Sequence, residues 1–73
     1  MSQARIPSLR HLDVLRAVVR HGGVHAAARM LGLSPSTVSV HLAGLSRSLG
    51  TGLVRRRGRG LEPTESGRAV AAA

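Results

Sequence analysis

The side chains with the strongest potential for specific outside contacts lie between residues 34 and 47. Apolar residues there recur at spacings of four, three and four, which predicts one buried helix face formed by Val38, Leu42, Leu45 and Leu49. The opposite face then carries Ser36, Thr37, Val40, Ala43, Gly44 and Arg47. Most of these side chains are short, so the helix can approach another surface closely. Hydroxyls can exchange hydrogen bonds with the edges of bases, and a valine can contact the methyl group of thymine.

A second group of contact residues is the arginine cluster at positions 55 to 59. Strand alternation sends neighbours to opposite faces, yet Arg55, Arg56, Arg57 and Arg59 still concentrate positive charge within five residues. A phosphate backbone or a minor groove would relieve that repulsion. We expect Arg56 and Arg57 to contact DNA and Arg59 to enter or cross the minor groove, with glycines on both sides of it allowing close approach. The alternative is a solvated charge run, above all at Arg55.

Capping signals predict three helices ahead of this cluster. Ser8 can cap a first helix that ends at His21-Gly22-Gly23 and has an inward stripe of Leu9, Leu12, Leu15 and Val19. A short second helix over 24–31 is expected to bury Ala27, Ala28 and Leu31, and Gly32 ends it. Ser34 accepts a hydrogen bond at the start of the third helix, over 35–49, where Pro35 has no amide to lose. Two helices joined by a tight glycine turn are typical of a helix-turn-helix.

The remaining residues predict a small wing and the start of another helix. Residues 53–56 and 61–63 read as two strands, with the hairpin tip at 57–60. Thr64 can cap a last helix, and Glu65 favours the positive end of that helix. The alanine run at 69–73 carries no stop signal, so we expect the front end of a longer protein; a frayed natural terminus is the alternative.

Composition restricts the possible partners. The 73 residues include 11 basic residues, all arginine, against 3 acidic ones, for a net charge of +8. An acidic polymer is the natural partner of such a chain. Arginine suits bidentate contacts with phosphate and guanine, although a genome rich in G and C would encode it as well.

Several other function classes find no support in the sequence. The four histidines lack metal-ligand spacing, and no carboxylate pair or activated nucleophile is evident, so we expect no metal, cofactor or catalysis. The lack of cysteine fits a reducing cytoplasm, and we expect a cytoplasmic protein because no apolar run has signal-peptide or membrane-spanning length. Single-strand and RNA binders usually stack bases on aromatic rings, which this chain lacks.

The chain resembles the N-terminal winged helix-turn-helix of LysR-type transcriptional regulators, from Leu9 to Ala73. The resemblance rests on Ala27-Ala28 with Leu31, on Ser34 and Ser39, on Leu45 with Leu49-Gly50, and on Leu53, Arg56, Gly58-Arg59-Gly60 and Thr64-Glu65-Ser66-Gly67. It implies a long linker helix from about Thr64 that pairs two subunits into a homodimer. It also implies a ligand-sensing domain, which lies outside this sequence, so a small-molecule effector is expected only if such a domain exists.

The sequence departs from the family pattern on the helix that would read DNA. Many relatives carry long polar or basic residues where Val40, Ala43 and Gly44 stand, which predicts shallow specificity here. Ser39 is expected to bond a phosphate or its own helix backbone. Arg47 is expected to reach a phosphate or to be solvated.

Together these features predict a mainly α fold, a winged helix-turn-helix with a three-helix core, a two-stranded wing and the start of a linker helix. The expected domains are an arm over 1–7, the DNA-binding domain over 8–63 and the truncated linker helix over 64–73. The expected partner is double-stranded DNA, with no membrane, contacted by Ser34, Pro35, Ser36, Thr37, Ser39, Val40, Arg47, Arg56, Arg57 and Arg59. A basic protein-interaction module or an RNA-binding module is the alternative.

Overall fold

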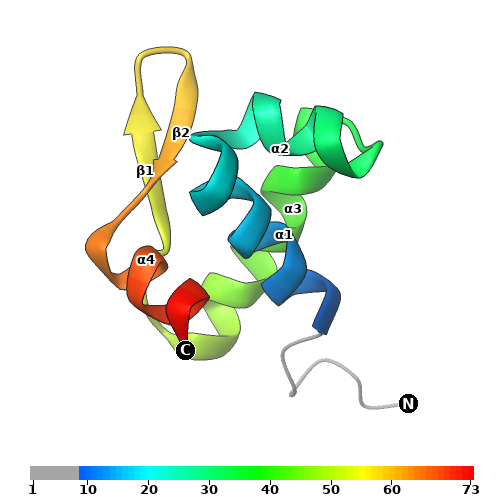
Figure 1. Ribbon diagram of the computed structural model, residues 1–73. Coiled ribbons are helices and arrows are strands. Elements are labelled where there is room, and N and C mark those ends of the chain that lie inside the picture. The colour runs from blue at the N-terminus through cyan, green and yellow to red at the C-terminus, as the bar shows by residue number, and fades with distance from the viewer. Residues whose placement is uncertain (1–8) are drawn as a thin grey trace.

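The computed structural model describes residues 9–73 as four helices and one β-hairpin (Figure 1). In chain order the elements are α1 (Leu9–His21), α2 (Val24–Leu31), α3 (Pro35–Leu49), β1 (Val54–Arg57), β2 (Gly60–Pro63) and α4 (Glu65–Ala72). Helix α1 packs against α2, α3 and α4, and the hairpin stands at one side of the helices. This arrangement confirms the predicted winged helix-turn-helix. The predicted arm over 1–7 and the Ser8 cap lie outside the described residues.

The core is entirely apolar and lies between α1, α2 and α3. Its buried residues are Val14, Leu15, Val18, Val24, Ala27, Ala28, Val38, Leu42, Leu45 and Leu53. The predicted stripe on α1 is partly wrong, because Val14 and Val18 are buried while Leu12 and Val19 are only partly covered. Because three helices pack around α1, its buried surface is wider than the predicted single stripe and is rotated about the helix axis relative to that stripe.

Two leucines that were expected in the core are exposed instead. Leu31 is 37% exposed and Leu49 is 43% exposed. Each is the last residue of its helix, and each is followed by a glycine in the left-handed conformation that turns the chain away. After the first of these turns, the Leu33 amide donates to the Ala28 carbonyl and the Leu33 side chain packs against the core. Leu33 thus takes the core position predicted for Leu31.

The hairpin is one residue longer at the tip end of each strand than the sequence predicted. Its register pairs Arg55 with Glu62, Arg56 with Leu61 and Arg57 with Gly60. Only residues 58 and 59 form the turn, where Gly58 has φ 58°, a backbone conformation that glycine adopts without strain. The register therefore places Arg55, Arg57 and Glu62 on one face of the hairpin, and Arg56 on the other.

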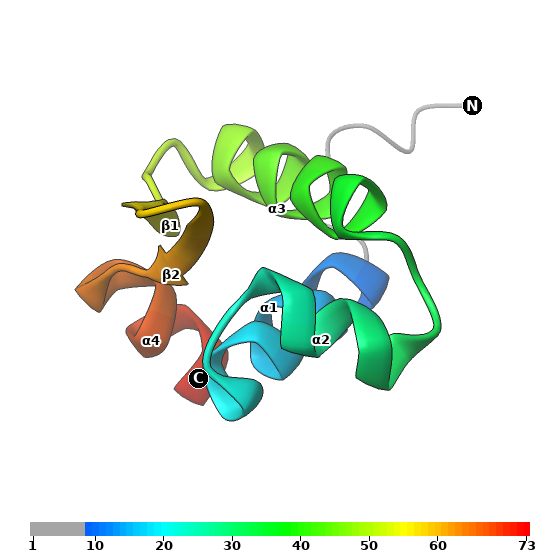
Figure 2. The same ribbon diagram turned by 90° about the horizontal axis from the view of Figure 1, so that it is seen from above.

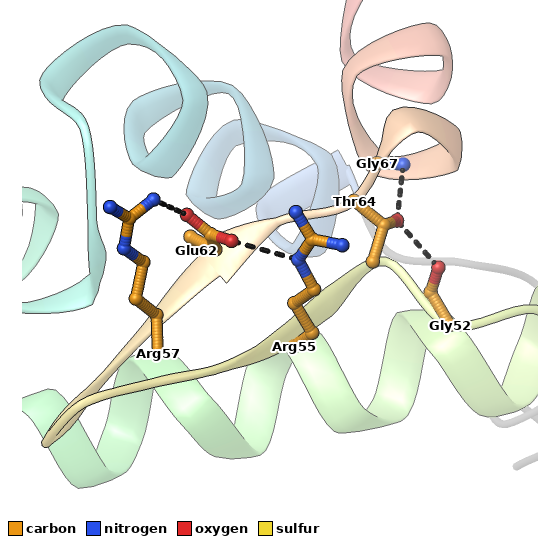
Figure 3. A network of polar contacts seen from close by, with 6 residues as sticks. All are labelled: Gly52, Arg55, Arg57, Glu62, Thr64 and Gly67. Atoms are coloured by element: carbon orange, nitrogen blue, oxygen red, sulfur yellow. Dashed lines mark hydrogen bonds and ion pairs between the residues drawn. The ribbon is translucent and has the colours of Figure 1, made fainter.

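A hydroxyl joins the start of α4 to the start of the wing. The Thr64 side chain accepts a hydrogen bond from the Gly67 amide at 3.0 Å, which confirms the predicted cap. The same hydroxyl donates to the Gly52 carbonyl at 2.8 Å, and the Thr64 amide donates to the Leu53 carbonyl at 2.9 Å. These contacts hold the two ends of the hairpin side by side (Figure 3).

Candidate nucleic-acid interface

The first turn of α3 is fixed by two hydrogen bonds between the same pair of residues. The Ser34 hydroxyl accepts from the Thr37 amide at 3.1 Å and donates to the Thr37 hydroxyl at 2.9 Å. The Thr37 hydroxyl keeps its own hydrogen, which can be donated to an acceptor outside the protein. No acidic residue lies in this turn, so the positive end of the helix dipole is not offset by a side chain there.

The outer side of α3 is uncovered by the other described elements (Figure 2). Ser36, Thr37 and Arg47 are exposed, and Val40 is 71% exposed, the highest value among the large hydrophobic residues described. Ser39 is half-buried, on the flank of the helix. Most residues predicted to face a partner from α3 therefore share one solvent-facing strip. Ser39 lies on its flank, and the prediction is wrong for Gly44, which is half-buried and packs against the His11 ring of α1. Whether any of them contacts DNA stays a prediction.

The wing carries an ion-pair network that the sequence analysis missed. Glu62 uses one carboxylate oxygen to accept from Arg55 Nε at 2.8 Å and the other to accept from Arg57 Nη1 at 3.0 Å (Figure 3). These two hydrogen bonds hold the pKa of the Glu62 carboxyl below its usual value. Glu62 therefore offsets part of the repulsion among the wing arginines within the protein, a contribution that the prediction of a phosphate or minor-groove contact left out. The predicted hairpin, with its tip at 57–60, already places Glu62 opposite Arg55, so attention to cross-strand pairs of opposite charge could have found the network.

The other two wing arginines have no such partner among the described residues. Arg56 lies on the opposite hairpin face, across from Leu61, and Arg59 lies in the turn. Both are exposed. The three wing arginines predicted to contact DNA therefore differ. Arg57 is already paired with a carboxylate, whereas Arg56 and Arg59 are available to an outside partner.

A histidine pair supports α3 from behind. The rings of His11 on α1 and His41 on α3 meet edge to face, with centroids 5.0 Å apart, and the Nδ1 atoms of both rings are buried without a hydrogen-bond partner. Burial lowers the pKa of His41, and the nearby positive charges of His11 and Arg10 lower it further. A Cβ atom on Gly44 would lie 3.1 Å from the His11 ring, so glycine at this position lets the two helices approach. No sequence spacing indicates this pair, because its members are 30 residues apart.

Residues 9–73 contain neither a candidate metal site nor a candidate membrane-spanning helix. No three histidine, cysteine or carboxylate side chains of this part of the chain lie close enough together to hold a metal ion. None of its helices combines the length and apolar character that a membrane crossing requires.

Comparisons with known proteins relate the chain to bacterial regulators. Residues 9–68 match the family described as bacterial regulatory helix-turn-helix protein, lysR family. The chain is 40% identical over 62 residues to the small neutral protease regulatory protein of Streptomyces coelicolor, a match that covers 85% of this chain and 19% of that protein. It is 44% identical over 62 residues to the transcriptional regulator LinR of Sphingobium indicum, covering 85% of this chain and 20% of that protein. The chain thus spans about a fifth of the length of these relatives.

Solved structures show the same likeness. The DNA-binding domain of CbnR in complex with DNA superposes with a TM-score of 0.80 at 32% identity, covering 89% of this chain and 75% of that one. Full-length LysG of Corynebacterium glutamicum gives a TM-score of 0.79 at 28% identity, covering 92% of this chain and 23% of that one.

Proposed function

The chain belongs to the LysR family of bacterial regulatory helix-turn-helix proteins, and we propose that it is the DNA-reading head of a transcriptional regulator with α3 in the major groove. The observation that carries this proposal is the uncovered outer strip of α3, which begins at a capped turn and contains the exposed Val40. DNA binding as such is a property of this domain family. The particular contacts are the proposal.

The dimensions of α3 favour the major groove. A helix with its side chains is about 10–12 Å across, and the groove is about 12 Å wide. Short side chains at Ser36, Thr37 and Val40 let the N-terminal half of α3 approach the edges of bases. Single hydroxyls discriminate less well than a bidentate pair, which is worth about 1–3 kcal/mol, so sequence specificity is shallow. Ser34 and Pro35 lie at the phosphate backbone, with Ser39 and Arg47 on its flanks.

The wing supplies contacts that do not depend on sequence. Arg59 enters or crosses the minor groove from the hairpin turn, Arg56 binds the phosphate backbone, and Arg57 can bind it once Glu62 releases the Arg57 guanidinium. The positive charge of the chain supports this role, because phosphate neutralisation supplies most of the affinity of non-specific DNA binding.

The rest of the protein follows from the family and is part of the same proposal. The helix that begins as α4 pairs two subunits, so that the regulator binds DNA as a homodimer in the cytoplasm. A small-molecule effector acts only through a further domain. The domain itself has no enzymatic activity and uses no cofactor.

NMR chemical-shift perturbation mapping tests the proposal, with duplex oligonucleotides recovered from a random pool as the ligand. We expect shifts at the α3 amides from Ser36 to Val40 and at the wing turn. Shifts confined to another surface, with α3 silent, would refute the proposed groove contact.

The Arg59→Ala variant tests the wing separately. It should weaken binding to all duplexes about equally and make the slope of log K against log salt shallower by about 0.9, the contribution of one phosphate contact. Fluorescence anisotropy titrations at several salt concentrations measure this slope. Arg20→Ala is the matched control, because it removes the same charge from an exposed position on α1. Equal slopes for the two variants would reject the Arg59 contact.

A further inference from the structure

Glu62 occupies both of its oxygens with arginines of the neighbouring strand. Arg55 stands directly across the hairpin from Glu62, and Arg57 is its diagonal neighbour on the same face. The arginine side chains remain 67% and 77% exposed, whereas that of Glu62 is 19% exposed. The carboxylate therefore lies between two guanidinium groups whose remaining N–H donors still reach solvent (Figure 3).

The surface next to this network is suited to an anion. A hollow of about 450 Å³ lies between α2 and the wing, lined in part by Arg29, Arg57, Glu62 and the first residues of α2. The cap residue of α2, Gly23, offers no side-chain hydrogen bond, and the first turn of α2 contains no acidic residue. Among the charged residues that line this hollow, Glu62 is the single negative one.

We propose that Glu62 competes with DNA phosphate for Arg55 and Arg57. By holding these two side chains, Glu62 keeps the DNA affinity of the domain below the value that its arginines would otherwise give. The proposal rests on the proposed function, since it assumes that the wing lies against duplex DNA. In the free protein the carboxylate accepts one N–H from each arginine and offsets the positive charge that would attract a phosphate. In the complex it also lies close to the incoming negative charge, so phosphate binding at this hairpin face requires displacement of Glu62 or proceeds without these arginines.

The competition has a measurable signature in the salt dependence of binding. Each additional phosphate contact steepens the slope of log K against log salt by about 0.9. Release of one or both arginines in Glu62→Gln should therefore steepen it by about 0.9 to 1.8. If both arginines are released, raising the salt concentration from about 50 to 200 mM should lower the affinity of Glu62→Gln about tenfold more than it lowers the affinity of the unmodified domain. Binding at the lower salt concentration should be tighter than that of the unmodified domain.

Glu65→Gln provides the matched control. Glu65 is exposed in the first turn of α4, no ion pair joins it to another described residue, and its replacement changes the net charge by the same amount. Anisotropy titrations with a duplex of fixed sequence should give a steeper slope for Glu62→Gln than for Glu65→Gln. A slope equal to that of the control, or weaker binding by Glu62→Gln at low salt, would overturn the proposal. Weaker binding would show that the carboxylate positions the arginines for DNA.

A triple variant identifies the released side chains. Replacing both Arg55 and Arg57 by Gln in the Glu62→Gln background should return the slope to that of the unmodified domain. If the steeper slope persisted, the added contacts would come from other residues and the proposal would fail. Failure of the proposed function is distinguishable, because the unmodified domain itself would then show no salt-dependent binding to duplex DNA.

Discussion

Replacement of Gly67 by alanine should destabilise the domain although it adds a better helix former. Gly67 is buried in the first turn of α4, where its amide donates to the Thr64 hydroxyl. A Cβ atom at this position would overlap the Leu53 carbonyl oxygen and lie 3.1 Å from the Leu53 carbonyl carbon. The obstacle is backbone, so a rotamer change cannot relieve the overlap. Either α4 or the start of the wing has to move.

The magnitude follows from two opposing contributions. Alanine in place of glycine favours a helix by about 1 kcal/mol. Overpacking typically costs about 1–3 kcal/mol, and a backbone obstacle favours the upper end of that range. We expect a net loss of about 2 kcal/mol in the free energy of unfolding. For a domain of this size, each kcal/mol lowers Tm by about 4–8 °C, so Tm should fall by roughly 8–16 °C.

Thermal unfolding followed by far-UV circular dichroism measures this change, which suits a chain without aromatic residues. Gly52→Ala is the control, because Gly52 has open space at its Cβ position and its carbonyl bond to Thr64 needs no side chain. This control should change the free energy of unfolding by no more than about 0.5 kcal/mol. A Gly67→Ala variant as stable as the control would refute the inferred close approach between α4 and Leu53.

Three further substitutions test the interface and its support. Ser34→Ala removes the cap of α3 and should cost about 1 kcal/mol in urea denaturation, whereas Ser34→Asp should keep most of the stability; equal losses would argue against the cap. The pKa of His41 is lowered in the folded state, so protonation opposes folding and stability should fall as pH drops through the ordinary histidine value of about 6.5. The difference in Tm between about pH 7.5 and 5.5 should therefore be smaller for His41→Gln than for the unmodified domain, and an unchanged difference would show that other groups control it. Val40→Arg should alter sequence preference more than total affinity, and recovery of the same site from a random duplex pool would show that Val40 does not face bases.

The sequence predicted the features that depend on local signals. The caps at Ser34 and Thr64 and the glycine stops at positions 32 and 50 act within a few residues, and the helix bounds confirm them. The burial of Leu42 and Leu45 follows from helical spacing, because α3 buries a single face. Most of its opposite face is exposed for the same reason, whereas the packing of Gly44 against His11 depends on where α1 lies.

The features that the sequence did not predict depend on packing between elements. The wide buried surface of α1 follows from its three helical neighbours, and the contact between His11 and His41 joins two separate helices. The role of Glu62 depends on side-chain contacts across the two strands of the hairpin, whose register is the one that the predicted tip at 57–60 implies. The one-residue difference in the strand bounds left this register unchanged, and what the sequence analysis missed was the contact of Glu62 with two arginines of the facing strand.

The Thr64 junction has a mechanical consequence. One oxygen atom is bonded to the chain segment that enters the hairpin and to the helix that leaves it. Neither segment can rotate without breaking a hydrogen bond to the shared oxygen, so a rotation of one segment is transmitted to the other. A force that rotates α4 would therefore tilt the hairpin and change how far its tip reaches.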